Sequence, residues 1–109
     1  MTTLVTCATS FVSLGFLREL RAEGEPAHVL IRDGSKAALF PDEKVFIGDI
    51  FDRKCVKTAV KDATTVVHVP PLAHPRGDEA SQMRMHRHAQ VESTRTVLEE
   101  VVSRGIRNF

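Results

Sequence analysis

Near its N-terminus the chain reads Thr3-Leu-Val-Thr-Cys-Ala-Thr-Ser-Phe-Val-Ser13. The first three residues favour a short β-strand, and small residues then interrupt the apolar run. Apolar residues return at helical spacing, separated by charged ones, until Gly24 provides a stop just beyond the last turn. The segment therefore predicts a strand, a turn and an amphipathic helix whose apolar positions are Val12, Phe16, Leu17 and Leu20.

The rest of the chain repeats this order of strand and helix. Continuous apolar runs without period-2 alternation are typical of strands covered on both faces, as in parallel sheets. Such runs lie at 27–31, 45–47 and 65–69. Shorter helical segments are expected at 35–40, capped by Ser35, and through Lys61 after the cap Asp52. Pro70 and Pro71 end the last strand, and residues 72–78 are expected to form a loop.

A long helix is expected from about residue 79 to 104, with Gly105 as its stop. Its apolar face is expected to carry Val91, Thr94, Leu98 and Val101, with Val97 and Val102 beside it.

Strands that alternate with helices predict right-handed crossovers and an α/β fold. We expect a Rossmann-like, three-layer architecture whose parallel sheet has four strands in the order 3-2-1-4. Residues 1–109 would form a single domain. The chain reaches Phe109 where the alternation requires a fifth strand, so we expect an incomplete domain, truncated before strand five and any catalytic region. The fourth strand would then be an open edge, which favours self-association or poor solubility.

Composition excludes several functional classes. The 109 residues carry 15 Lys plus Arg and 14 Asp plus Glu, and the net charge of +1 gives no basic footprint for nucleic acid. No apolar run approaches the ~20 residues that span a bilayer, and no secretory signal begins the chain. We therefore expect a cytoplasmic protein that binds neither nucleic acid nor membranes. Its two cysteines are expected to be reduced thiols.

Several motifs together resemble the extended short-chain dehydrogenases/reductases. This family holds NAD-dependent sugar-nucleotide epimerases and dehydratases and the regulatory NmrA-like proteins. Residues 3–13 resemble the family's T-G-A-T-G-F-V-G loop, and the resemblance extends over the whole chain. The further matches are Phe16-Leu-Arg-Glu-Leu20, Val29-Leu-Ile-Arg-Asp33, Gly48-Asp-Ile-Phe-Asp52, Thr65-Val-Val-His68, Gln90-Val-Glu-Ser-Thr94 and Arg107-Asn-Phe109.

The three glycines of the family loop are replaced by Cys7, Ser10 and Ser13. Those glycines allow a tight turn, close approach of the backbone to a pyrophosphate, and close packing of helix on strand. A side chain at positive φ costs on the order of 1 kcal/mol. We therefore expect weakened cofactor binding and hypothesise a gene under relaxed selection. Gln90 and Ser93 similarly replace the family's Asn and Gly before Thr94, which weakens the expected site further.

The resemblance implies a cofactor site for NAD or NADP. The loop would hold the pyrophosphate, Asp49 and Ile50 would flank the adenine, and the segment after strand four would approach the ribose. Arg32, at the end of strand two, favours NADP because a guanidinium can clamp a 2′-phosphate, although Asp33 beside it opposes this. Asp49 could equally be a turn residue, and Arg32 a solvated charge. The predicted cofactor-binding residues are Thr6, Cys7, Thr9, Ser10, Phe11, Val12, Arg32, Asp49, Ile50, Val69, Pro70 and Pro71.

Catalysis in the family uses a Ser and a Tyr-x-x-x-Lys pair, and these 109 residues contain no tyrosine. No catalytic residue is therefore assigned. We interpret the chain as the N-terminal NAD(P)-binding portion of an epimerase/dehydratase-like oxidoreductase, catalytically incomplete as given. The alternatives are a non-catalytic dinucleotide-sensing or partner-binding module of the NmrA-like kind, or a decayed fragment that binds no cofactor.

Two other site types receive little support. His68, His74, His86 and His88 lie close in sequence, but His86 and His88 would point to opposite sides of a helix, so no metal site is predicted. His68 is expected to be a satisfied histidine in the sheet. A helix N-terminus could depress the pKa of the Cys7 thiol, but no base is placed beside it, which favours an inert thiol.

Overall fold

The computed structural model describes residues 1–71 and 77–109, in which four strands form one parallel sheet. The strands are β1 (Thr3–Val5), β2 (His28–Ile31), β3 (Lys44–Ile47) and β4 (Thr65–Val67), in the order β3-β2-β1-β4. In register, Val5 lies opposite Val29 on one side and Val67 on the other. The predicted α/β class, parallel pairing and strand order are therefore confirmed.

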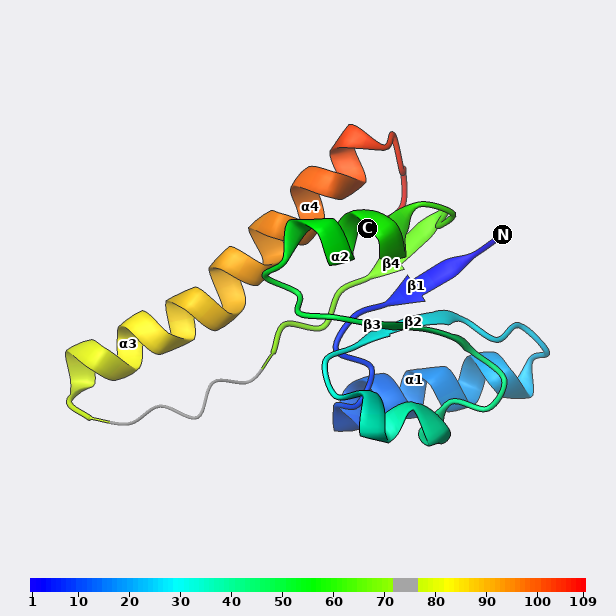
Figure 1. Ribbon diagram of the computed structural model, residues 1–109, viewed down its shortest axis with the longest axis horizontal. Coiled ribbons are helices and arrows are strands. Elements are labelled where there is room, and N and C mark those ends of the chain that lie inside the picture. The colour runs from blue at the N-terminus through cyan, green and yellow to red at the C-terminus, as the bar shows by residue number, and fades with distance from the viewer. Residues whose placement is uncertain (72–76) are drawn as a thin grey trace.

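Helices cover both faces of the sheet and produce three layers (Figure 1). α1 (Phe11–Ala22) and the 3₁₀ helix η1 (Gly34–Leu39) lie on one face, and α2 (Arg53–Val60) and α4 (Ser93–Ser103) lie on the other. Side chains from the strands alternate between two separate cores. Val5, Val29 and Ile31 pack on the α1 side, and Leu4, Leu30 and Val66 pack on the α2 and α4 side. This double burial explains why the strands read as continuous apolar runs.

Aspartates cap the N-termini of both α2 and η1. Asp52 caps α2 as predicted, because its side chain accepts a hydrogen bond from the Lys54 amide. Ser35 was the wrong residue for the cap of η1. The cap is Asp33, whose carboxylate accepts from both the amide and the hydroxyl of Ser35, at 3.0 and 2.7 Å. A carboxylate at the helix start can accept two bonds at once, and the serine acts as the donor.

α1 forms where predicted but buries a different face. Leu17 is buried as expected, whereas Val12 and Phe16 are 68% and 38% exposed. The buried line instead runs through Ser13 and Leu17, because α1 begins directly over β1 and only a small side chain fits beneath its first turn.

The long C-terminal helix is interrupted by a π-helical turn. α3 (Glu79–Arg87) is followed by the π-helical turn η2 (His88–Glu92) and then by α4. None of the residues of α3 is buried, and this helix projects from the body of the molecule (Figure 1).

The predicted apolar face of this helix was partly wrong. Val97 and Val101 are buried, but Leu98 and Val102 are 40% and 69% exposed, and Val91 is also exposed. A π turn inserts one extra residue and rotates the faces before and after it relative to each other, which a single periodicity over the whole helix cannot represent. In the described parts of the chain, every helix is too short or too polar to cross a membrane.

β4 is shorter than predicted and ends at Val67. Beyond α4, Asn108 forms a parallel bridge with Thr65, and its carbonyl oxygen accepts a hydrogen bond of 2.9 Å from the Val66 amide. The chain thus runs beside β4 at the place where a fifth strand was predicted. The predicted loop 72–78 lies largely in 72–76, outside the described residues.

Candidate functional site

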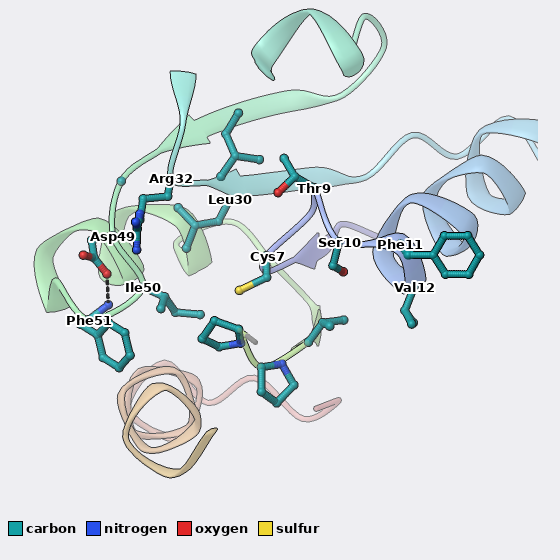
Figure 2. Close-up of a pocket in the computed structure, with 15 residues that line it drawn as sticks. Cys7, Thr9, Ser10, Phe11, Val12, Leu30, Arg32, Asp49, Ile50 and Phe51 are labelled. Atoms are coloured by element: carbon teal, nitrogen blue, oxygen red, sulfur yellow. Dashed lines mark hydrogen bonds between the residues drawn. The ribbon is translucent and has the colours of Figure 1, made fainter. Parts of the chain in front are cut away.

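A cavity of about 470 Å³ opens at the carboxyl ends of the strands (Figure 2). The sheet order places β2 and β4 on opposite sides of β1, and ligands of open parallel sheets bind at such a switch point. All residues predicted to hold a cofactor line this cavity except Thr6. Sequence reasoning missed Leu30, Ile31, Gly48 and Phe51. Phe51 could have been found, because it directly follows the Asp49-Ile50 pair.

Cys7 occupies the sharpest turn of the loop between β1 and α1. Its φ is +47°, the left-handed conformation that favours glycine, and it is the one non-glycine residue with positive φ among those described. The Ser10 amide donates to the Cys7 carbonyl at 3.1 Å, which closes the turn. The backbone therefore keeps the conformation expected at the first glycine position, although a side chain is present.

Ser10 and Ser13 form a short hydrogen-bonded path inside the same loop. Ser10 Oγ caps α1 by accepting from the Ser13 amide at 3.2 Å, and it donates to Ser13 Oγ at 2.9 Å. Ser13 Oγ in turn donates to the Thr6 carbonyl at 3.4 Å. The amides of Phe11 and Val12 belong to the first helical turn and have no intrahelical acceptor, so this end of α1 can receive an anion.

Asp49 has a structural role at the rim of the cavity. Its Oδ1 accepts a hydrogen bond of 2.9 Å from the Phe51 amide, which fixes the turn after β3. A carboxylate has a second oxygen, so the turn role and a ligand role are compatible. Gly48 before it has to be small, because a Cβ there would lie 2.5 Å from the Cys55 sulfur.

Arg32 and Asp33 differ in their surroundings. Arg32 lines the cavity, whereas the carboxylate of Asp33 is used to cap η1. Hydrogen bonds from the Ser35 hydroxyl and amide lower the pKa of Asp33. The negative charge that opposed the NADP assignment is therefore held in the cap and is absent from the cavity lining.

Thr6 lies beneath the cavity and holds His68. Thr6 Oγ1 accepts from the Val69 amide at 3.0 Å and lies 2.8 Å from His68 Nδ1, while His68 Nε2 lies 3.0 Å from Thr94 Oγ1. Thr94 Oγ1 donates to the Gln90 carbonyl. Because the Thr94 hydroxyl proton is used toward Gln90, the His68 Nε2–H donates to Thr94. In a neutral imidazole Nδ1 then accepts from the Thr6 hydroxyl, and every group is satisfied. The network joins β1, the end of β4 and the long C-terminal helix.

The titration behaviour of two groups follows from their burial. Burial, reinforced by the charge of Asp49, raises the pKa of the Cys7 thiol to about 11. The raised pKa agrees with the inert thiol that the sequence favours and speaks against the alternative of a depressed pKa. Burial lowers the pKa of His68 to about 4, which agrees with its neutral role between two threonines.

Within the described residues, no group of three or more histidine, cysteine or acidic side chains could hold a metal ion. His68 uses both ring nitrogens in hydrogen bonds, and His74 lies outside the described residues.

The chain was compared with protein families and with curated proteins. The model of the 3-beta hydroxysteroid dehydrogenase/isomerase family matches residues 4–109. The comparison with curated proteins gives no match.

Several solved structures of similar fold contain NAD. A short-chain dehydrogenase/reductase superfamily protein from Agrobacterium tumefaciens with bound NAD is 22% identical, with a TM-score of 0.75, over 98% of this chain and 30% of its own. The Thermus thermophilus UDP-glucose 4-epimerase complex with NAD is 22% identical, with a TM-score of 0.81, and the match covers 98% of this chain and 35% of the epimerase. MoeE5 in complex with UDP-glucuronic acid and NAD is 24% identical, with a TM-score of 0.77, and the match covers 98% of this chain and 34% of MoeE5. The chain thus shares their fold and spans about a third of their length.

The strain at Cys7 can be measured by comparing two substitutions that both remove the sulfur. We expect Cys7→Gly to be more stable than Cys7→Ala by about 1 kcal/mol, because only glycine adopts positive φ without cost. At an ordinary position alanine is the more stable of the two. Urea denaturation of both variants measures the difference, and an alanine variant as stable as the glycine variant would contradict a strained turn.

The buried state of His68 predicts a pH dependence. The unfolded imidazole titrates near 6.5 and the folded one near 4, so the unfolded chain binds more protons between these values. The free energy of unfolding is therefore expected to fall as pH drops from about 6.5 toward 4. His68→Gln should be less stable at pH 7 but should have a shallower slope in this window. Denaturant unfolding at several pH values tests this, and parallel curves for the two proteins would refute it.

Proposed function

The chain belongs to the 3-beta hydroxysteroid dehydrogenase/isomerase family, and on this premise we propose that it binds a nicotinamide dinucleotide as the NAD(P)-binding portion of an epimerase/dehydratase-like oxidoreductase. The observation that carries the proposal is the cavity at the switch point of the sheet, which the residues expected to hold the cofactor surround. The similar structures with NAD support it, because almost the whole of this chain matches about a third of each of them.

Different parts of the cavity would hold the pyrophosphate, the adenine and a ribose of the dinucleotide. The pyrophosphate would lie over the loop, where the free amides of Phe11 and Val12 and the positive end of the α1 dipole favour an anion. The adenine would lie between Ile50 and the second carboxylate oxygen of Asp49, which can accept from its amino group. The segment 69–71 would border a ribose.

Within this proposal, Arg32 gives a preference for NADP. Its guanidinium lines the cavity at the end of β2, and Asp33 is held in the cap of η1. A guanidinium can make two charge-assisted hydrogen bonds to a 2′-phosphate, which the 2′-hydroxyl of NAD cannot accept in the same way. We also place the protein in the cytoplasm, where both cysteines, which are free, would remain reduced.

Titration with NADPH and NADH, followed by nucleotide fluorescence or calorimetry, tests the function and the preference. We expect NADPH to bind more tightly, and Arg32→Ala to weaken NADPH about tenfold while NADH changes less than twofold. Arg18→Ala is the control, because Arg18 is an exposed cation on α1 that does not line the cavity. The absence of binding by either nucleotide would overturn the function. An equal loss for both nucleotides in Arg32→Ala would overturn the preference alone.

We further propose that the outer edge of β4 allows copies of the chain to associate. The Val66 amide on this edge is paired with Asn108, and the Val66 carbonyl points the same way. β4 carries no charged residue that would block such pairing, and Phe109, which is 52% exposed, lies beside it against His68. Sedimentation at tens of micromolar should detect association, and Phe109→Lys should reduce it. A monomeric wild-type profile would refute the proposal.

A further inference from the structure

Phe51 and His88 form an aromatic stack at the nucleobase end of the cavity. Their ring centroids lie 4.4 Å apart and the planes differ by 13°. Phe51 lines the cavity next to Asp49 and Ile50, and it also packs against the core on the α2 and α4 side. His88 is the first residue of the π-helical turn η2. The stack therefore connects the turn after β3 to a helix that is distant in sequence.

Both partners of the stack are held in place by their backbones. The Phe51 amide donates to Asp49 Oδ1, so the backbone that carries the ring is fixed by the residue proposed to contact adenine. On the other side, two backbone carbonyls of η2 receive hydroxyl donors. Ser93 Oγ donates to the Ala89 carbonyl at 2.5 Å, and Thr94 Oγ1 donates to the Gln90 carbonyl at 2.6 Å. The π turn is thus a fixed feature, and it determines the direction in which His88 leaves the helix.

His88 is well placed to fix the orientation of Phe51. Phe51 is only partly buried, and a loop phenylalanine that is not fully packed keeps rotamer freedom whose loss on ligand binding costs affinity. A face-to-face partner selects one rotamer before a ligand arrives. α3 contributes no buried residue, and the stack joins the start of η2 to the rim of the cavity.

We propose that His88 is a positioning residue, which holds the Phe51 ring as a preformed wall for a planar nucleobase. This inference rests on the proposed function, because it assigns the adenine end of the dinucleotide to this part of the cavity. It adds a specificity element that distinguishes a planar purine from other ligands of similar charge, because a preordered aromatic surface favours a flat, polarizable group.

The test uses two mononucleotide halves of the cofactor, AMP and nicotinamide mononucleotide, titrated into the wild-type chain and three variants by calorimetry. We expect His88→Ala to weaken AMP three- to tenfold, the range that an aromatic pair contributes, and to leave nicotinamide mononucleotide unchanged. His88→Phe should restore AMP binding because it keeps a flat ring at this position. His86→Ala, an exposed histidine two residues earlier, is the matched control and should bind like the wild type.

The possible outcomes separate this inference from the proposed function. If the wild type binds AMP and His88→Ala binds it equally well, the positioning role is overturned and the function stands. If His88→Ala weakens both mononucleotides equally, its role is general folding, and the inference is again overturned. If the wild type binds neither, the proposed function fails and the nucleobase wall fails with it. NMR of the ligand-free chain then decides whether the stack itself exists, because His88→Ala must shift the Phe51 ring protons if the two rings are in contact.

Discussion

The structure depends on the backbone reversal between β1 and α1. The chain leaves the centre of the sheet at Thr6 and enters a helix at Phe11, and it makes this turn with Cys7 at a φ of +47°. A non-glycine residue in this region costs about 1–2 kcal/mol. The cost is offset by bonds that only this path allows, including the Ala8 amide to the Leu30 carbonyl and the Ser10 amide to the Cys7 carbonyl. Any other path would direct the start of α1 away from the cavity.

The opposite wall of the cavity is held by side chains. His68 contacts Thr6, which directly follows β1, and Thr94 of α4. One neutral imidazole therefore ties the end of the central strand, the end of β4 and the long helix together. Because Thr6 also accepts from the Val69 amide, the direction in which the chain leaves β4 toward Pro70 is fixed by the same hydroxyl. Protonation of His68 would place a donor at Nδ1, so the Thr6 hydroxyl would have to rotate and accept from it. A residue that does not line the cavity thus supports one of its walls.

The sequence was sufficient for the parts of the fold that depend on local chemistry. Strands covered on both faces appear as apolar runs, Asp52 caps α2, and Gly24 and Gly105 end their helices at positive φ. The failures depend on tertiary contacts. The outward position of Phe16 is decided by which face of α1 lies against the sheet. The exposure of Leu98 and Val102 follows a π turn that no simple periodicity reveals. Thr6 belongs to the expected motif, but its hydroxyl bonds His68 beneath the cavity and does not line it. The Phe51–His88 contact joins two residues that share no sequence pattern.

The serines at glycine positions have a physical role that the sequence could not reveal. Considered alone, Ser10, Ser13 and Ser93 are losses of conformational freedom and space. In the structure each hydroxyl has a partner: Ser10 caps α1, Ser13 reaches the Thr6 carbonyl, and Ser93 donates to the Ala89 carbonyl in the π turn. Ser13 and Ser93 are completely buried, where an unpaired hydroxyl would cost about 1–3 kcal/mol. The three hydroxyls thus stabilise the loop and the helix at positions where the resemblance places glycine.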